Sequence, residues 1–250
     1  MGKVTYAVRK GPRSYQEDYS CHMPIGNSSC SGWLLAVADG HGGQAVAEMI
    51  VQEIPKLFQL KDSAKPENAL RKLVDSLNKK TAQFSDIGST LSIACIFENP
   101  LTASIAILGD SPVIVLDGEQ ELHISPEHNI RSNSKELRRV EKRGGICIDG
   151  YVFKNDGARG FDYGIQMSRA LGDNCLSPVI SHKPEIYTIE NPRWVLVASD
   201  GVFDPAHEDK SVFKEIKEFA IKRVSAEDVM QWAEKKGLED NATDLVWSSD

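Results

Sequence analysis

The chain has 250 residues, of which 41% are hydrophobic and 26% are charged, and its formal net charge is −7. This length suffices for one sizeable hydrophobic core, and the composition is that of an ordinary globular protein. The acidic charge argues against nucleic acid as a partner, and no apolar run reaches the roughly 20 residues that a membrane helix needs. The five cysteines lack Cys-x-x-Cys spacing, which indicates reduced thiols and predicts a cytoplasmic or nuclear protein.

Hydrophobic periodicity predicts strands interrupted by pairs of helices. Strands are expected at 3–9, 17–23 and 33–38, followed by helices at 43–59 and 66–84. Short strands are expected next at 89–97, 102–108, 113–116 and 121–124, before a basic helix at 134–143. After an irregular stretch at 146–180 come strands at 185–189 and 194–199, helices at 208–223 and 226–236, and a strand at 242–247. Ser225, with Asp228 three residues on, is a good N-cap for the last helix.

A carboxylate follows each of two short, uninterrupted apolar runs. Leu34–Ala38 leads into Asp39-Gly40, and Trp194–Ser199 leads into Asp200-Gly201. Such runs are typical of strands buried on both faces, and Asp-Gly ends the strand in a turn. Each carboxylate is therefore expected on a rigid support, as hard cations such as Mg²⁺ prefer. For one copy alone, an ordinary turn is the better interpretation.

Further groups extend this pattern. The full set of candidates is Arg13, Glu17, Asp18, Asp39, Gly40, His41, Asp110, Asp200, Asp204, Asp240 and Asn241. Most of the carboxylates stand at strand edges, where they can converge. Clustered acids repel one another unless cations offset their charge, and two metal ions about 4 Å apart would satisfy such a cluster.

The same residues resemble the motifs of the metal-dependent serine/threonine protein phosphatases of type 2C. The motifs keep the family's order over the whole chain: Arg13-Ser14-Tyr15-Gln16-Glu17-Asp18, Asp39-Gly40-His41-Gly42-Gly43, Gly88-Ser89-Thr90, Gly109-Asp110-Ser111, Glu136 to Gly145, Ser168-Arg169-Ala170-Leu171-Gly172-Asp173, Ser199-Asp200-Gly201-Val202-Phe203-Asp204 and Asp240-Asn241-Ala242-Thr243. Any one motif is weak evidence, but the ordered series is specific.

The resemblance implies an α+β fold. Two antiparallel β-sheets would form a central sandwich with helices on both outer faces, in four layers (α-β-β-α). Residues 1–250 would form a single type 2C catalytic domain with a flap-like insertion at about 146–184 beside the active site. We expect this domain to act as a monomer, away from membranes.

The resemblance also implies a set of metal ligands for two Mn²⁺ or Mg²⁺ ions per chain. Asp39 would bridge the two ions. Glu17 and the Gly40 carbonyl would complete one of them, and Asp200 and Asp240 would hold the other. Phosphoserine and phosphothreonine in proteins would be hydrolysed by a water that bridges the ions, with no phosphoenzyme intermediate.

Three more residues receive roles from the resemblance. Arg13 would bind the substrate phosphate, His41 would protonate the leaving oxygen, and Asp18 would support metal-bound waters without contacting the metal. Asn241 is expected either to serve a turn or to support the ligands in the same way. An ordinary surface arginine and a structural histidine are the alternatives for the first two. The segments Gly88 to Thr90 and Ser168 to Asp173 are expected to serve packing and backbone geometry rather than catalysis.

Other parts of the pattern leave alternatives open. Asp110 and Asp204, with Asp200, match positions that hold a weaker third ion in some relatives, although turn or cap roles fit the first two nearly as well. Pro112 stands where the family usually has Arg, so hydrogen bonding near that third site is expected to differ. Glu127 stands where the family more often has Asp.

Two other functions compete with the phosphatase prediction. One is an inactive, phosphatase-like binding module, and the other is a metal phosphoesterase that acts on small molecules or nucleotides. The presence of Glu17, Asp39, Asp200 and Asp240 argues against the first, and the motif order argues against the second.

Overall fold

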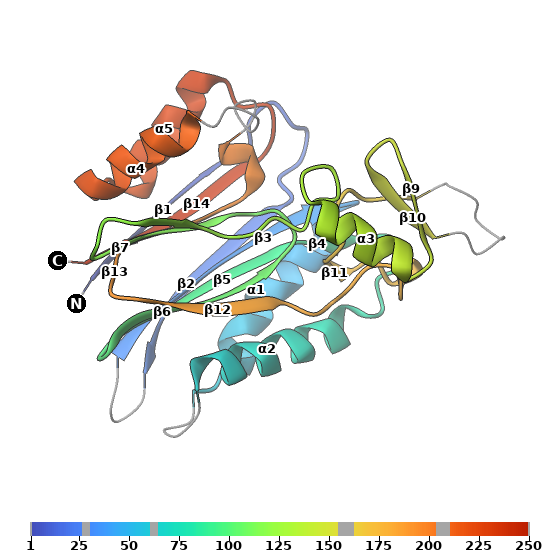
Figure 1. The fold of residues 1–250 in the computed structure, drawn as a ribbon, viewed down its shortest axis with the longest axis horizontal. Coiled ribbons are helices and arrows are strands. Elements are labelled where there is room, and N and C mark those ends of the chain that lie inside the picture. The colour runs from blue at the N-terminus through green and yellow to red at the C-terminus, as the bar shows by residue number, and fades with distance from the viewer. Residues whose placement is uncertain (1, 27–30, 61–64, 155–162, 204–210, 250) are drawn as a thin grey trace.

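The structure is a computed structural model that describes residues 2–26, 31–60, 65–154, 163–203 and 211–249. Two antiparallel sheets lie face to face, and helices cover the outer face of each (Figure 1). The predicted α+β sandwich of four layers is thereby confirmed. Each helix in the described ranges is too short or too polar to cross a membrane.

The larger sheet has the strand order β11-β4-β3-β5-β6-β12, with β2 paired to β3. Its strands are β2 (Asp18–Gly26), β3 (Ser31–His41), β4 (Gly88–Ser89), β5 (Leu91–Glu98), β6 (Leu101–Leu108), β11 (Leu171–Gly172) and β12 (Glu185–Glu190). Helices α1 (Ala45–Leu57) and α2 (Pro66–Thr81) pack on its outer face. Pro55 lies within the last turn of α1.

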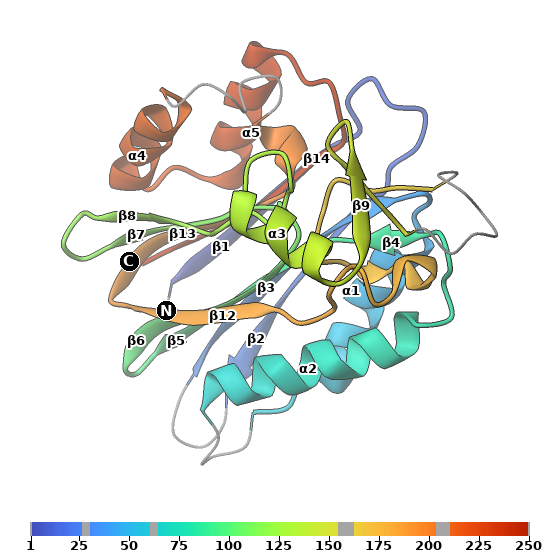
Figure 2. The ribbon, with the colours of Figure 1, turned by 45° about the vertical axis from the view of Figure 1, so that its right-hand side comes forward.

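The smaller sheet has the order β1-β14-β13-β7-β8. Its strands are β1 (Lys3–Arg9), β7 (Val113–Asp117), β8 (Leu122–Ile124), β13 (Pro192–Ala198) and β14 (Ala242–Ser248). Helices α4 (Val212–Lys222) and α5 (Ala226–Lys236) cover it on the other side of the molecule (Figure 2). The predicted cap of α5 is present, because Ser225 Oγ accepts from the Asp228 N–H and Asp228 Oδ2 accepts from the Ser225 N–H.

Strand β3 is buried on both faces, which explains why its sequence is apolar throughout and does not alternate between apolar and polar residues. Leu34, Ala36 and Ala38 face the helices α1 and α2. Leu35 and Val37 face the second sheet. Both faces of the strand are therefore shielded from water. Burying each large side chain contributes about 1.5–3 kcal/mol to the stability of the fold. The strand end that carries Asp39 is held rigidly as a result.

The stretch at 146–180 was expected to be irregular, and this prediction was wrong for the part that the structure describes. A hairpin of β9 (Gly145–Ile148) and β10 (Tyr151–Lys154), strand β11 and the 3₁₀ helix η1 (Asn174–Leu176) lie in or beside it. The strands are short and only half-buried, so their apolar pattern is weak. Their stability comes from a small local core shared with Val140 of α3 (Ser134–Lys142), next to the hairpin in Figure 1.

A buried ion pair joins α3 to the flap. Glu136 accepts hydrogen bonds from Arg169 Nη2 at 2.8 Å and from Ser168 Oγ at 2.5 Å, and Arg139 also contacts it. Burial alone would raise the pKa of Glu136, but the hydrogen bonds from Arg169 and Ser168 outweigh burial and lower it to about 2. Two motifs that are distant in sequence thus form one structural unit.

Candidate active site

A cleft of about 330 Å³ lies between one end of the sandwich and the flap. The lining residues from the sandwich that the sequence singled out are Arg13, Glu17, Asp39, Gly40, His41, Asp110, Asp200, Asp240 and Asn241. The flap contributes Tyr151 and the run from Gly164 to Met167. Asp18 lies buried behind this surface. Asp204, with the adjacent Pro205, lies outside the described residues.

Asp39 is fixed through its backbone at the end of β3. The Asp39 carbonyl accepts from the Thr90 N–H at 2.9 Å and from Ser89 Oγ at 3.0 Å, and the Asp39 N–H donates to Thr90 Oγ1 at 3.2 Å. The Gly88 to Thr90 motif therefore serves backbone geometry, as predicted. Asp18 lies directly opposite Asp39 in the register of β2 and β3.

The carboxylates of the cleft repel one another. Loss of solvent raises the pKa of Asp39 well above its usual range, and the charges of Asp18, Asp200 and Asp110 raise it further. Burial also raises the pKa of Asp110, and it raises the pKa of Asp18 to about 6 despite a 2.6 Å hydrogen bond from Ser199 Oγ. A compact group of oxygen donors with excess negative charge has the chemistry of a divalent-cation site.

Asn241 joins the loop before β2 to the start of β14. Its Nδ2 donates to the carbonyls of Lys10 and Tyr15 at 2.8 and 3.0 Å, and its Oδ1 accepts from the Glu17 N–H at 2.8 Å. This amide thus places Glu17 beside the neighbouring Asp240. A supporting position of this kind was one of the two roles expected for Asn241.

Arg13 lies at the rim of the cleft. Its Nη2 donates to Asp240 Oδ2 at 2.5 Å, and its side chain is 53% exposed. Gly11 allows the loop to lie this close to β14, because it has a positive φ of 60° and a Cβ there would lie 2.2 Å from the Asp240 carbonyl oxygen. Arg13 is thus a cation on a short loop that faces the carboxylates.

Asp110 lies in a turn with its own supports. Asn129 Nδ2 donates to Asp110 Oδ2 at 2.9 Å, and the Gly109 N–H donates to Nδ1 of His128 at 3.2 Å. Burial lowers the pKa of His128 to about 4, so this ring is neutral and can accept. Pro112 leaves the sheet intact, since its carbonyl accepts from the Ala198 N–H at 3.0 Å. Glu127 places further negative charge near Asp110.

His41 contacts a residue that the sequence did not single out. Its Nε2 lies 2.8 Å from Oδ2 of Asp173, whose Oδ1 accepts from the Tyr163 hydroxyl at 2.6 Å. Asp173 closes a motif that was expected to serve only packing and backbone geometry, and that interpretation is incomplete. His41 and Asp173 are 132 residues apart, and they meet because β4 pairs with both β3 and β11.

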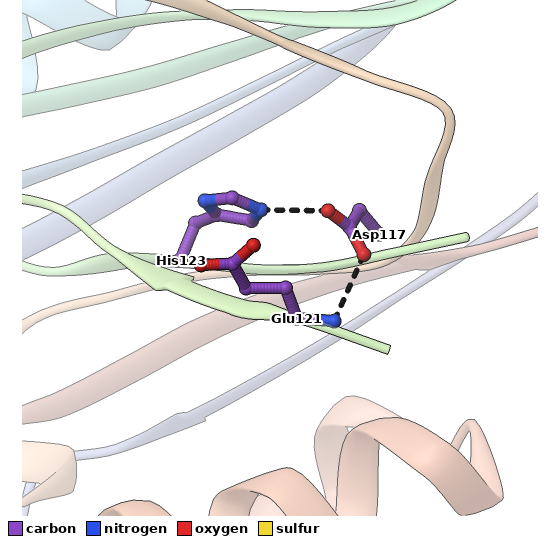
Figure 3. A group of neighbouring side chains, drawn as sticks. All are labelled: Asp117, Glu121 and His123. Carbon is purple, nitrogen blue, oxygen red and sulfur yellow. Dashed lines mark hydrogen bonds and ion pairs between the residues drawn. The ribbon is translucent and has the colours of Figure 1, made fainter. Parts of the chain in front are cut away.

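A second group of possible metal ligands lies away from the cleft, on the β7–β8 hairpin (Figure 3). Asp117 Oδ1 accepts from the N–H groups of Glu119 and Glu121, both at 2.9 Å. Its Oδ2 lies 2.8 Å from Nε2 of His123. Both carboxylate oxygens of Asp117 thus have partners, and the group is explained as a hydrogen-bonded turn.

The comparison with protein families agrees with this fold and cleft. The family described as "Protein phosphatase 2C" matches residues 10–242. The chain therefore belongs to the protein phosphatase 2C family, a family of metal-dependent serine/threonine protein phosphatases.

Named relatives and solved structures cover nearly the whole chain. "Probable protein phosphatase 2C 59" of Oryza sativa subsp. japonica is 29% identical over 251 residues, which cover 96% of this chain and 74% of the relative. The structure of a C. elegans sex determining protein has a TM-score of 0.74 at 27% identity, covering 99% of this chain and 64% of that one. The PstP catalytic domain in complex with two manganese ions has a TM-score of 0.67 at 19% identity, covering 99% and 97%.

Proposed function

We propose that this phosphatase hydrolyses phosphoserine and phosphothreonine in proteins with two bound divalent cations, Mn²⁺ or Mg²⁺, and without a phosphoenzyme intermediate. One observation carries the metal dependence: Asp39 lines the cleft together with Glu17, Asp200 and Asp240, which come from separate parts of the chain. Burial raises the pKa of Asp39, and the charges of neighbouring acids raise it further. Ligands of this type fit a hard cation. The related fold of PstP, solved with two manganese ions, supports the number of ions.

The ligand assignment follows from the resemblance to the family, and the cleft is lined by the residues that it needs. Asp39 would bridge the ions, Glu17 and the Gly40 carbonyl would complete one, and Asp200 and Asp240 would complete the other. When bound, the two cations would lower the pKa of a water shared between them and offset charge on the phosphate oxygens. A weaker third ion would use Asp110 and Asp200, together with Asp204, which lies outside the described residues.

The side chains of the cleft perform the remaining steps. Arg13 would bind two phosphate oxygens with its planar guanidinium and hold phosphorus in line for attack by water. His41 would donate a proton to the serine or threonine oxygen as the P–O bond breaks, which is typically worth about 10²–10⁴-fold in rate.

The expected partners are phosphoproteins, and we propose a monomer of one catalytic domain with neither nucleic acid nor membrane as a partner. We also propose a cytoplasmic or nuclear location. The four described cysteines, Cys21, Cys95, Cys147 and Cys175, are free thiols, which fits a reducing compartment.

Hydrolysis of a phosphothreonine peptide by the wild type and by Asp200→Asn, with Mn²⁺ and with chelator, tests this proposal. The wild type should turn over only with metal, and Asp200→Asn should lose that activity. Asp117→Asn is the matched control, because it changes an Asp in a turn outside the cleft and should keep full activity. Metal binding without turnover would favour the binding module, and faster turnover of free nucleotides than of peptides would favour the small-molecule phosphoesterase.

A further inference from the structure

We propose that Asp173 is a positioning residue for His41, and that Tyr163 of the flap in turn holds Asp173. The proposal rests on the proposed function, in which His41 protonates the leaving oxygen. It assigns a chemical task to an aspartate that neither holds metal nor contacts substrate in that scheme.

The hydrogen bond decides which nitrogen of His41 faces the reaction. Nε2 lies 2.8 Å from Asp173 Oδ2, and the Asp173 side chain is fully buried while His41 is 21% exposed in the cleft. Among the described residues, Nδ1 of His41 has no hydrogen-bond partner. With Nε2–H donated to Asp173, Nδ1 is the nitrogen available to the cleft.

The proton transfer then has one route. The Nδ1–H proton passes to the serine or threonine oxygen as the P–O bond breaks and its electron pair stays on that oxygen. The ring starts as an imidazolium with a proton on each nitrogen, and it becomes a neutral imidazole with Nε2–H still bonded to Asp173. The carboxylate of Asp173 keeps the ring from rotating and keeps the proton on Nε2, so that Nδ1 stays directed toward the substrate.

The local structure is built to bring Asp173 to this place. Its N–H donates to the Ile87 carbonyl at 3.1 Å, and its backbone is left-handed with φ 49° and ψ 38°. A Cβ at Gly88 would lie 2.0 Å from Asp173 Oδ2, so only glycine leaves room for the carboxylate. Gly88 is also the residue opposite His41 in the pairing of β3 and β4.

Tyr163 occupies the other oxygen of Asp173. Its hydroxyl donates to Oδ1 at 2.6 Å, and its ring packs against the local core of the flap. Both oxygens of Asp173 are therefore used, one by the flap and one by His41. The position of the flap is thereby connected to the orientation of the general acid.

The test compares two substrates that differ in their need for a general acid. A phosphothreonine peptide releases a poor alkoxide leaving group, whereas 4-nitrophenyl phosphate releases a stable phenolate that needs no proton. For Asp173→Asn we expect kcat on the peptide to fall about 10²-fold, the low end of general-acid effects. On the aryl phosphate, kcat should fall less than about 3-fold, since that step does not use the proton.

Controls separate positioning from general damage. Asp149→Asn changes another left-handed aspartate of the flap, which is exposed, and should leave both substrates unaffected. In a His41→Gln background, Asp173→Asn should cause no further loss on the peptide, because the two residues act as one unit. Tyr163→Phe should also lower kcat more on the peptide than on the aryl phosphate, but by a smaller factor. This variant replaces Asp173→Asn in the test if Asp173→Asn fails to fold.

The protonation state of the ring gives a readout independent of turnover. In ¹⁵N-histidine spectra recorded above the pH at which the ring loses its second proton, neutral His41 should keep its proton on Nε2 in the wild type and become a mixture of tautomers in Asp173→Asn. Equal losses on both substrates, no loss on either, or an unchanged His41 tautomer would overturn the role of Asp173 while leaving the phosphatase function intact. A wild type inactive on both substrates would overturn the proposed function and this inference with it.

Discussion

Asp18 is buried behind the cleft and Glu136 is buried beneath the flap, and the charged groups around these two carboxylates have opposite signs. Asp18 lies among other acids, and its pKa is raised to about 6 mainly because it is buried. Glu136 lies against Arg169, and its pKa is lowered to about 2 because the hydrogen bonds it accepts outweigh burial. The protein thus satisfies the charge of Glu136 internally, whereas among the described residues no such internal cation contributes to the raised pKa values of Asp18 and Asp39. The first arrangement stabilises the fold, and in the proposed function the second binds metal ions.

The largest effect is expected from removing the central carboxylate of the cleft. Asp39→Asn should lower phosphothreonine-peptide hydrolysis by about 10³-fold or more, because metal ions supply several kcal/mol of charge stabilisation to the transition state. Steady-state kinetics with saturating Mn²⁺ measures this loss. Activity within about 10-fold of the wild type would show that Asp39 is not a metal ligand, since each tenfold corresponds to only 1.4 kcal/mol.

Breaking the ion pair of Glu136 should affect stability instead. Arg169→Ala leaves the buried Glu136 without its main partner, and losing one member of a buried pair costs about 3–5 kcal/mol. Urea unfolding of the chelated protein measures this change. The control is Arg138→Ala on the exposed side of α3, for which a change within about 0.5 kcal/mol is expected. Equal changes for both arginines would contradict the difference drawn between the two regions.

The two regions should also respond to pH in opposite directions in the metal-free protein. The pKa of Glu136 is depressed from 4.5 to about 2, so its contribution of about 3 kcal/mol is fully present above pH 4.5 and is lost as pH falls toward 2. The pKa of Asp18 is raised to about 6, so stability should fall as pH rises from 4 to 6. Unfolding free energies across pH 2–7 measure both slopes.

Single variants identify the residue responsible for each change of unfolding free energy with pH. Glu136→Gln should remove the loss at low pH. Asp18→Asn should reduce the decline between pH 4 and 6 without abolishing it, because Asp39, Asp110 and Asp244 also have raised pKa values. An unchanged decline in Asp18→Asn would place its origin elsewhere in the protein.

The sequence predicted the carboxylates of the cleft well and their partners poorly. The apolar runs before Asp39 and Asp200 identify strand ends, and strand ends of packed sheets meet, so the convergence of these acids was predictable. The contact of His41 with Asp173 was not, because β4 and β11 have two residues each and leave no periodic signal. The hairpin of β9 and β10 was missed for a similar reason, since its side chains pack only on a small local core.

A smaller effect is expected at Asp244, a buried carboxylate on β14 outside both regions. Burial raises its pKa well above the usual range, so ionisation at neutral pH opposes folding. Asp244→Asn should therefore stabilise the protein by about 1 kcal/mol at pH 8, the order of one net hydrogen bond, and have less effect at pH 5. Destabilisation at both pH values would indicate that the carboxylate has a structural partner that the amide cannot replace.

Thermal unfolding of the wild type and Asp39→Asn, first with chelator and then with increasing Mn²⁺, tests most directly whether the cleft is built for cations. The wild-type Tm should rise with Mn²⁺ concentration, since a ligand at 100 times its Kd stabilises the folded state by about 2.7 kcal/mol. Asp39→Asn should unfold at a higher temperature than the wild type in chelator, because repulsion is relieved, and should respond little to Mn²⁺. A wild-type Tm that does not depend on Mn²⁺, or the same rise in both proteins, would contradict the assignment of these carboxylates to divalent cations.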